Sequence, residues 1–351
     1  MAVLHRFSRA APEKPYLILR SIFSIGISAM SILVRVTTAD LFDGADRGRA
    51  MMIGSVVCWM ATYISMIGSS FLLTSGLPWK TTVYVAPFVT VPSIIAFYCL
   101  MPRTTTTKRL HRSKLRVLTE LKDLLQIKSA MLLILGHAFG DMCGKAAWFW
   151  LPTIRLYGHS WKTSDFFYGL DYPTITTIFT VLNIVGELSG MTLNLWLYES
   201  WQDGRNIFTG HANQRALPIV ASTQYLITAP LQIASLALFT VNFPASLALY
   251  FIQALLGGGY LALLANSALN ATPHRLRAAS VALHFLALGV LDSPSSFMVG
   301  ALSDAFRAER TDDKSHFFSL LWANAFLLIF VVVAAGILIA MLFLPKRRRE
   351  S

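Results

Sequence analysis

The residues best suited to chemistry form a short series, His137, Asp141 and Lys145, spaced four residues apart. On a helix, positions i, i+4 and i+8 share one face, so the three titratable side chains would form a single stripe. Such a stripe can move a proton, with Asp141 as the carrier, Lys145 as its charge partner and His137 as a relay. The alternative is a structural ion pair in which Asp141 and Lys145 only neutralise each other.

The segments around this stripe are apolar enough to cross a membrane. Of the 351 residues, 55% are hydrophobic and 14% are charged, and the mean hydropathy of +0.56 is typical of a polytopic membrane protein. Nine windows are long enough to cross a hydrocarbon core of about 30 Å. They cover residues 17–36, 52–74, 82–101, 129–151, 173–197, 216–240, 244–269, 278–302 and 316–344.

Further ionisable residues lie inside these windows, where each costs roughly 3 kcal/mol unless it faces a partner or a cavity. Glu187 lies near the middle of its span, and Asp292 follows His284 by two helical turns. We therefore predict that Glu187 and Asp292 join the stripe on a pathway for substrate or protons. Arg35 lies about one turn from the end of its span, and its long stem favours snorkelling to the interface.

The net charge of +12 does not indicate nucleic-acid binding, because the basic residues lie mainly in short loops, as in membrane topology control. The loop charges predict that residues 102–128 and the C-terminal tail are cytoplasmic. With nine spans the N-terminus lies outside, where Arg6, Arg9 and Lys14 break the trend. The three cysteines have no paired spacing, so the sequence indicates neither a disulfide framework nor a zinc site. We expect no metal and no cofactor.

The segment from 102 to 128 is the one substantial linker. An apolar stripe runs through its lysines and arginines, formed by Leu115, Leu118, Leu121 and Leu125. This pattern predicts an amphipathic helix on an anionic cytoplasmic leaflet. The alternative is a solvated tether.

A charged loop motif occurs twice. "ADLFDGADRGRAMM" joins the first and second spans, "NSALNATPHRLRAASV" joins the seventh and eighth, and R-x-R-A opens the next helix in both. The residues predicted to form cytoplasmic gating loops are Asp40, Asp43, Arg47, Arg49, Arg275 and Arg277. Charge pairs across such a loop either anchor topology or latch one transporter state. Spans one to three thus correspond to spans seven to nine, which predicts two six-helix halves with the first three helices absent.

Two stretches carry a family resemblance. "RSIFSIGISAMSILVRVTTADLFDGADRGRAM" is similar to the fourth helix of the Spinster-like branch of the major facilitator superfamily, which runs R-x-L-x-G-I-G-E-A and ends in A-D-L-F. "LDSPSSFMVGALSD" resembles the eleventh helix of that branch, G-D-x-x-S-P followed by G-x-x-S-D. Ile27 stands where the family has glutamate.

The resemblance implies an all-α membrane protein with the superfamily's helical bundle, its nine transmembrane helices corresponding to helices 4–12. Residues 1–101 would form an incomplete N-terminal bundle of three helices, 102–128 a cytoplasmic linker with an amphipathic helix, and 129–351 a C-terminal six-helix bundle. The helix that carries the stripe would line the central cavity.

The function that the resemblance implies is secondary transport of lysolipid, sphingolipid or another amphipathic small molecule, moved either with protons or down its own gradient, in an endolysosomal or plasma membrane. Membrane lipids are then partners. The alternative is a truncated, transport-inactive membrane protein with an interaction or regulatory role, or an incomplete gene model. A third class, an intramembrane enzyme with Asp141 and Asp292 as an aspartyl pair, is disfavoured, because neither H-E-x-x-H nor G-x-S-x-G occurs and "HAFGD" lacks the first glycine of G-x-G-D.

Overall fold

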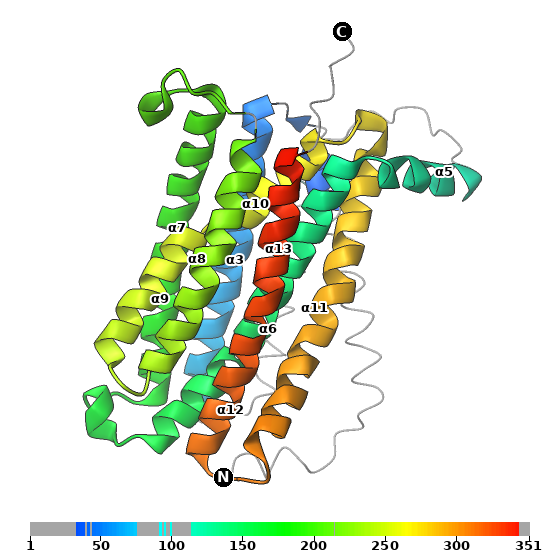
Figure 1. Ribbon diagram of the computed structural model, residues 1–351. Coiled ribbons are helices and arrows are strands. Elements are labelled where there is room, and N and C mark those ends of the chain that lie inside the picture. Colours follow the sequence, from blue (N-terminus) through cyan, green and yellow to red (C-terminus); the bar gives the residue numbers. More distant parts are fainter. Residues whose placement is uncertain are drawn as a thin grey trace.

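The computed structural model describes residues 33–38, 41–42, 44–75, 91–92, 95, 99, 114–213 and 215–343. Within these ranges the chain forms helices and no strand. All of the long helices run along roughly one axis and pack side by side (Figure 1). Residues 33–38 form one further helical segment.

The helices have the following bounds: α3 Gly44–Thr74, α5 Lys114–Leu125, α6 Lys128–Trp161, α7 Tyr172–Asp203, α8 Ala216–Leu238, α9 Phe243–Gly257, α10 Tyr260–Asn270, α11 Arg277–Arg307, α12 Asp313–Phe326 and α13 Leu328–Ala340. Short 3-10 helices occupy four connections or ends: η1 Ser164–Phe167, η2 Asn206–Phe208, η3 His274–Leu276 and η4 Met341–Phe343.

Most predicted spans have counterparts among these helices, whereas spans 17–36 and 82–101 lie mainly outside the described residues. Within the described ranges, four helical stretches are long and apolar enough to cross a membrane: Asp165–Phe208, Ala216–Leu238, His274–Arg307 and Asp313–Ala340. Helix α6 is longer than its predicted span of 129–151, because it continues through Pro152 to Trp161. The all-α membrane fold is therefore as predicted.

Local capping determines where several helices begin at one end of the bundle. The side chain of Asp171 accepts a hydrogen bond from the Thr174 amide at 3.0 Å, and Asn242 caps the Ala245 amide at 3.1 Å. Asp312 likewise caps Ser315 at 3.0 Å. Hydrogen bonds from Ser315 hold the pKa of the Asp312 carboxyl below its ordinary value. These caps satisfy amides that the first helical turn leaves unpaired.

The predicted span 244–269 consists of two helices, α9 and α10, separated at Gly258 and Gly259. Gly259 has a φ of +81°, a left-handed conformation that glycine adopts without strain. The break removes helical partners from nearby carbonyl groups. The buried side chain of Asn194 in α7 replaces them, donating to the Leu256 oxygen at 3.1 Å and the Gly258 oxygen at 2.6 Å.

Helix α7 packs very closely on α9 because two of its residues are glycines. A Cβ atom added at Gly190 would collide with the backbone oxygen of Leu255, and one at Gly186 would lie 2.7 Å from the Ala254 Cβ. Helix α7 is therefore held at backbone contact beside the break between α9 and α10.

Helices α6 and α11 run parallel and form a second close pair (Figure 1). The Trp150 indole donates to the Ser296 oxygen at 2.8 Å, and Gly300 lies opposite the same ring. Because the helices are parallel, residues about 150 positions apart become neighbours, as Trp150 and Ser296 illustrate with a separation of 146.

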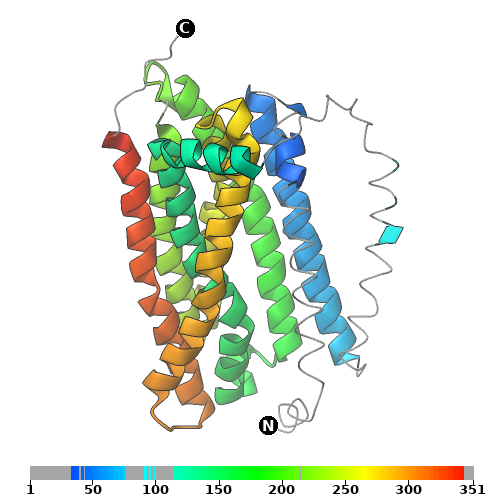
Figure 2. The same ribbon diagram turned by 90° about the vertical axis from the view of Figure 1, so that its right-hand side faces the viewer.

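The linker contains helix α5, which lies crosswise at one end of the bundle (Figure 2). We call this the α5 end. Leu124 and Ile127 are buried there against Leu276, while Leu125 is exposed. The side chains of Leu115 and Leu118 lie outside the described residues. The residues that pack on the bundle here, Leu124 and Ile127, are therefore not members of the predicted apolar stripe.

Candidate functional site

A cavity of about 250 Å³ lies among α3, α6, α7, α8 and α9. Three of the predicted pathway residues line it, namely Asp141 and Lys145 of α6 and Glu187 of α7. Its other polar lining residues are Ser55, Thr62, Tyr225, Thr228, Gln232 and Gln253. Apolar side chains such as Met191 and Trp148 complete the wall. A cavity that combines apolar surface with charged and polar groups can accept an amphipathic molecule.

Asp141 and Asp292 come together across the α6–α11 pair. Asp141 is 6% exposed, and its carboxyl group interacts electrostatically with the Asp292 carboxyl of α11. The Oδ1 atom of Asp292 is buried without a hydrogen-bond partner among the described residues. Two neighbouring carboxylates repel each other, and a proton on one of them removes the repulsion. This pair is therefore suited to bind and release one proton.

Lys145 lies one helical turn beyond Asp141, on the same face of α6. Its side chain is exposed, whereas that of Asp141 is buried. The ammonium group acts electrostatically on both Asp141 and Asp292. Lys145 can thus offset a negative charge on the carboxyl pair.

His137 lies one turn from Asp141 in the other direction and does not line the cavity. Its Nδ1 atom is 2.6 Å from the Nε2 atom of His284 on α11, and the two rings meet edge to face at 4.6 Å. Two residues of α11 therefore lie against the stripe of α6. His137 faces His284, and Asp141 faces Asp292.

Glu187 lies in a network that connects α3 to α7. Its carboxyl group interacts electrostatically with Tyr63 of α3, and Asn183 lies one turn away from it on α7. The Nδ2 atom of Asn183 also donates to the Tyr63 oxygen. Tyr63 is 1% exposed, so these contacts are shielded from solvent.

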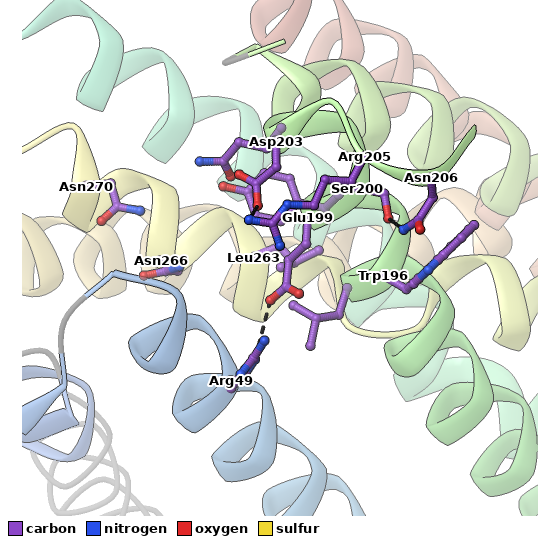
Figure 3. A pocket seen from close by; sticks show the side chains of 13 residues that line it. Arg49, Trp196, Glu199, Ser200, Asp203, Arg205, Asn206, Leu263, Asn266 and Asn270 are labelled. Carbon is purple, nitrogen blue, oxygen red and sulfur yellow. Dashed lines mark hydrogen bonds and ion pairs between the residues drawn. The ribbon is translucent and has the colours of Figure 1, made fainter. Parts of the chain in front are cut away.

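A second, larger pocket of about 410 Å³ lies at the α5 end, between α3, α7 and α10 (Figure 3). Arg49 reaches across it from α3, with its Nε atom 3.7 Å from the Glu199 carboxylate of α7 (Figure 3). Arg49 also lies 3.7 Å from Asp46 on its own helix. Asp40, Asp43 and the Arg47 side chain, the other predicted members of this loop motif, lie outside the described residues.

The second copy of the loop motif contacts the linker helix. Arg275 donates to the Asp123 carboxylate of α5 at 2.9 Å, and Arg277 begins α11. The ion pair lies beside the apolar contact of Leu124 with Leu276. A polar and an apolar contact therefore attach α5 to the loop between α10 and α11.

Arg35 does not lie as the snorkelling interpretation predicts. Its guanidinium stacks over the Phe285 ring at 4.8 Å, beside His284, and its Nη1 atom is buried. An aromatic face attracts a cation electrostatically, so the bundle interior offers Arg35 a partner without access to water.

Arg155 was not among the predicted site residues. It is 5% exposed on α6, with its guanidinium 3.5 Å from the Phe179 ring centroid and 4.7 Å from that of Tyr250. Its Nε and Nη2 atoms have no hydrogen-bond partner among the described residues. Sequence reasoning missed it because the predicted span stopped at residue 151. The sequence did carry a signal for Arg155, because a charged residue within a long apolar run is often functional.

The bundle, its central cavity and the charged groups around it define a membrane transporter. The profile of the Major Facilitator Superfamily matches residues 4–212, and the chain belongs to this family. It is an integral membrane protein with the transporter fold of that family.

Two crystal structures of a bacterial homolog of the human lysosomal transporter Spinster share this fold, both inward-facing. With the unoccupied form the TM-score is 0.56 at 16% identity, covering 88% of this chain and 73% of that chain. With the occupied form the TM-score is 0.55 at 15% identity, covering 88% and 72%. No curated protein matches the sequence.

Proposed function

We propose that this family member is a proton-coupled secondary transporter of a lysolipid, sphingolipid or similar amphipathic small molecule. The observation that carries the proposal is the carboxyl pair of Asp141 and Asp292, with Asp141 at the wall of a cavity lined by both apolar and polar side chains. The cargo is also suggested by the similarity to a homolog of the lysosomal transporter Spinster. An endolysosomal or plasma membrane location is part of the proposal.

In this mechanism the carboxyl pair binds the proton, and Lys145 balances the negative charge after the proton leaves. Glu187 is a second acidic group in the same cavity. His137 and His284 lie one turn towards the α5 end, where they can pass a proton to or from the pair. The proton site and the substrate then share one cavity, so that occupancy of one changes the environment of the other.

The domain division belongs to the same proposal: residues 1–101 as one bundle, 102–128 as the linker and 129–351 as the other. Alternating access requires two bundles to move against each other around a central site. The contacts at the α5 end made by Arg49 and Arg275 would break and re-form in that motion, as gating loops. Asp40, Asp43, Arg47 and Arg277 are assigned to these loops by their place in the sequence motif.

Reconstituted protein tests this function. In proteoliposomes with an imposed pH gradient, we expect saturable uptake of radiolabelled lysophosphatidylcholine that the gradient accelerates. Asp141→Asn and Asp292→Asn should abolish the acceleration, because an amide cannot bind and release a proton in this range. The control is Asp304→Asn, which removes an exposed carboxylate from the same helix, α11, at the end away from α5.

Two results would count against the proposal. If both cavity variants respond to the gradient as the wild type does, the carboxyl pair does not carry the proton. If folded wild-type protein takes up neither lysophosphatidylcholine nor sphingosine 1-phosphate, the interaction or regulatory role becomes the better explanation.

A further inference from the structure

Two glutamine side chains line the central cavity from neighbouring helices. Gln232 belongs to α8 and Gln253 to α9, and these helices pack side by side (Figure 1). We call Gln232 and Gln253 the cavity glutamines. The charged side chains that line the cavity all come from α6 and α7 among the described residues. The part of the wall formed by α8 and α9 is therefore polar but uncharged.

The amide groups of the cavity glutamines are not used by the protein itself. Neither amide is hydrogen-bonded to another residue in the described part of the chain. Gln232 is only 8% exposed, so it lies well inside the bundle. Leaving a buried polar group unpaired is costly, and such groups in native proteins usually meet a ligand or an ordered water. Both amides are thus available to a molecule in the cavity.

The two glutamines border the same part of the cavity. Thr228 lies one turn from Gln232 on the same face of α8, and its hydroxyl donates to the Gln224 carbonyl of its own helix at 2.7 Å. A Cβ atom added at Gly257 of α9 would lie 3.6 Å from the Cγ2 atom of Thr228 and 3.9 Å from the Nε2 atom of Gln253. The Gln253 amide therefore lies beside the face of α8 that carries Gln232.

The chemistry of this wall matches a hydroxyl group. A side-chain amide offers both a donor and an acceptor, and a hydroxyl group can accept from one amide while it donates to another. A phosphate only accepts and an ammonium only donates, so each would leave part of the two amides unpaired. Such charged groups find partners of opposite charge on α6 and α7, in Lys145, Asp141 and Glu187.

We propose that Gln232 and Gln253 determine substrate specificity by binding the free glycerol hydroxyl of a lysophospholipid. The inference rests on the proposed function, because it names the chemical group by which the cavity would recognise its amphipathic cargo. A sphingoid base fits this wall less well. It carries an ammonium group on the carbon next to its hydroxyl, and α8 and α9 place no carboxylate among the described lining residues.

The test compares two ligands that differ only in that hydroxyl. One is lysophosphatidylcholine, and the other is its 2-deoxy analogue, which has the same chain and headgroup but hydrogen in place of the glycerol hydroxyl. Equilibrium binding of each radiolabelled ligand is measured with the full purified chain in lipid nanodiscs. Gln232→Met and Gln253→Met remove the amide at nearly constant side-chain length.

Gln224→Met is the matched control. Gln224 lies two turns from Gln232 on the same face of α8, but it does not line the cavity. Its amide atoms are buried and also lack a hydrogen-bond partner among the described residues. The control therefore removes the same chemical group from the same helix without changing the cavity wall.

The wild type should bind lysophosphatidylcholine about tenfold more tightly than the analogue, because the analogue leaves the two amides unpaired. Each cavity variant should lower this preference, and the double variant should bind both ligands with equal affinity. Gln224→Met should keep the wild-type preference. Equal affinities in the wild type, or an undiminished preference in the double variant, would overturn the inference. Should the double variant not fold, an undiminished preference in both single variants refutes it.

Binding is measured without a pH gradient, which separates this inference from the proposed function. If the wild type transports nothing but shows a hydroxyl preference that the cavity variants lose, transport fails and the specificity site stands. If uptake is proton-coupled but the wild type binds both ligands equally, only this inference fails. A wild type that binds neither ligand refutes the lysophospholipid site, while proton-coupled uptake of sphingosine 1-phosphate would still support the proposed function.

Discussion

At the residue scale, Asn194 illustrates how one side chain stabilises a broken helix. Its amide donates to the carbonyls of Leu256 and Gly258, which the break between α9 and α10 deprives of helical donors. Asn194→Leu is similar in size but cannot donate, and buried unpaired carbonyls cost about 1–3 kcal/mol each. We therefore expect a clearly lower melting temperature in detergent for this variant.

Asn324 provides the comparison for that prediction. It is also buried, but its Nδ2 atom contacts the Leu320 carbonyl within its own helix, and its Oδ1 atom has no hydrogen-bond partner among the described residues. Asn324→Leu should therefore be close to neutral or stabilising. Equal losses in the two variants would show that the Asn194 contacts with the break add nothing.

At the element scale, the close approach of α7 to α9 makes a prediction about glycines. Gly190→Ala would place a methyl group against the Leu255 carbonyl, which is backbone and cannot rotate away. Forcing extra volume into a packed interface costs about 1–3 kcal/mol. Gly336→Ala in α13 meets nothing within 4 Å, so it should be neutral or gain roughly 0.5–1 kcal/mol from helix propensity.

Unfolding midpoints in detergent would measure both glycine variants. A Gly190→Ala variant as stable as the wild type would mean that α7 and α9 can separate at little cost. Because Glu187 lies within the same segment of α7, its place in the cavity wall would then be loosely held.

Helix boundaries show what the sequence predicted well and what it did not. Hydropathy located the apolar segments. It reports how favourably side chains transfer into lipid, but it does not report the backbone hydrogen bonds that determine where a helix ends. It therefore ended the fourth span at residue 151, whereas α6 continues to Trp161. It also merged α9 with α10, although the run Gly257–Gly258–Gly259 carried the signal for a break.

At the scale of the whole molecule, the ends of the helices make a prediction about topology. The start of α6, the end of α7 and helix α5 share one end, and the loop between α11 and α12 lies at the other (Figure 1). In a background without Cys58, Cys99 and Cys143, Lys122→Cys should react with an impermeant maleimide from the cytosol. Arg310→Cys should react only from the opposite side.

Labelling of both positions from the same side would contradict this topology. It would mean that the number of spans between residues 122 and 310 is even, contrary to the arrangement of α6 to α11. Intact cells and permeabilised cells provide the two measurements.

Contacts between helices were the least predictable level. The spacing of His137, Asp141 and Lys145 predicted a shared face, but not that α11 would place Asp292 against Asp141 and His284 against His137. These pairs depend on the parallel packing of α6 and α11, which no local pattern encodes. The Tyr63 hydroxyl was missed for the same reason, since tyrosine in an apolar span carries no distinctive signal.

The break between α9 and α10 also bears on how the chain enters the membrane during synthesis. With 15 and 11 residues, the two helices are about 22 Å and 16 Å long, each shorter than the hydrocarbon core. Neither can be inserted alone, so the translocon must recognise both as one segment before the break is stabilised. Asn194 lies on α7, which is synthesised before α8 and α9. It must therefore already be in the membrane when Gly258 and Gly259 are inserted. The chain is therefore synthesised in an order that places the Asn194 donor in the membrane before the carbonyl groups of Leu256 and Gly258.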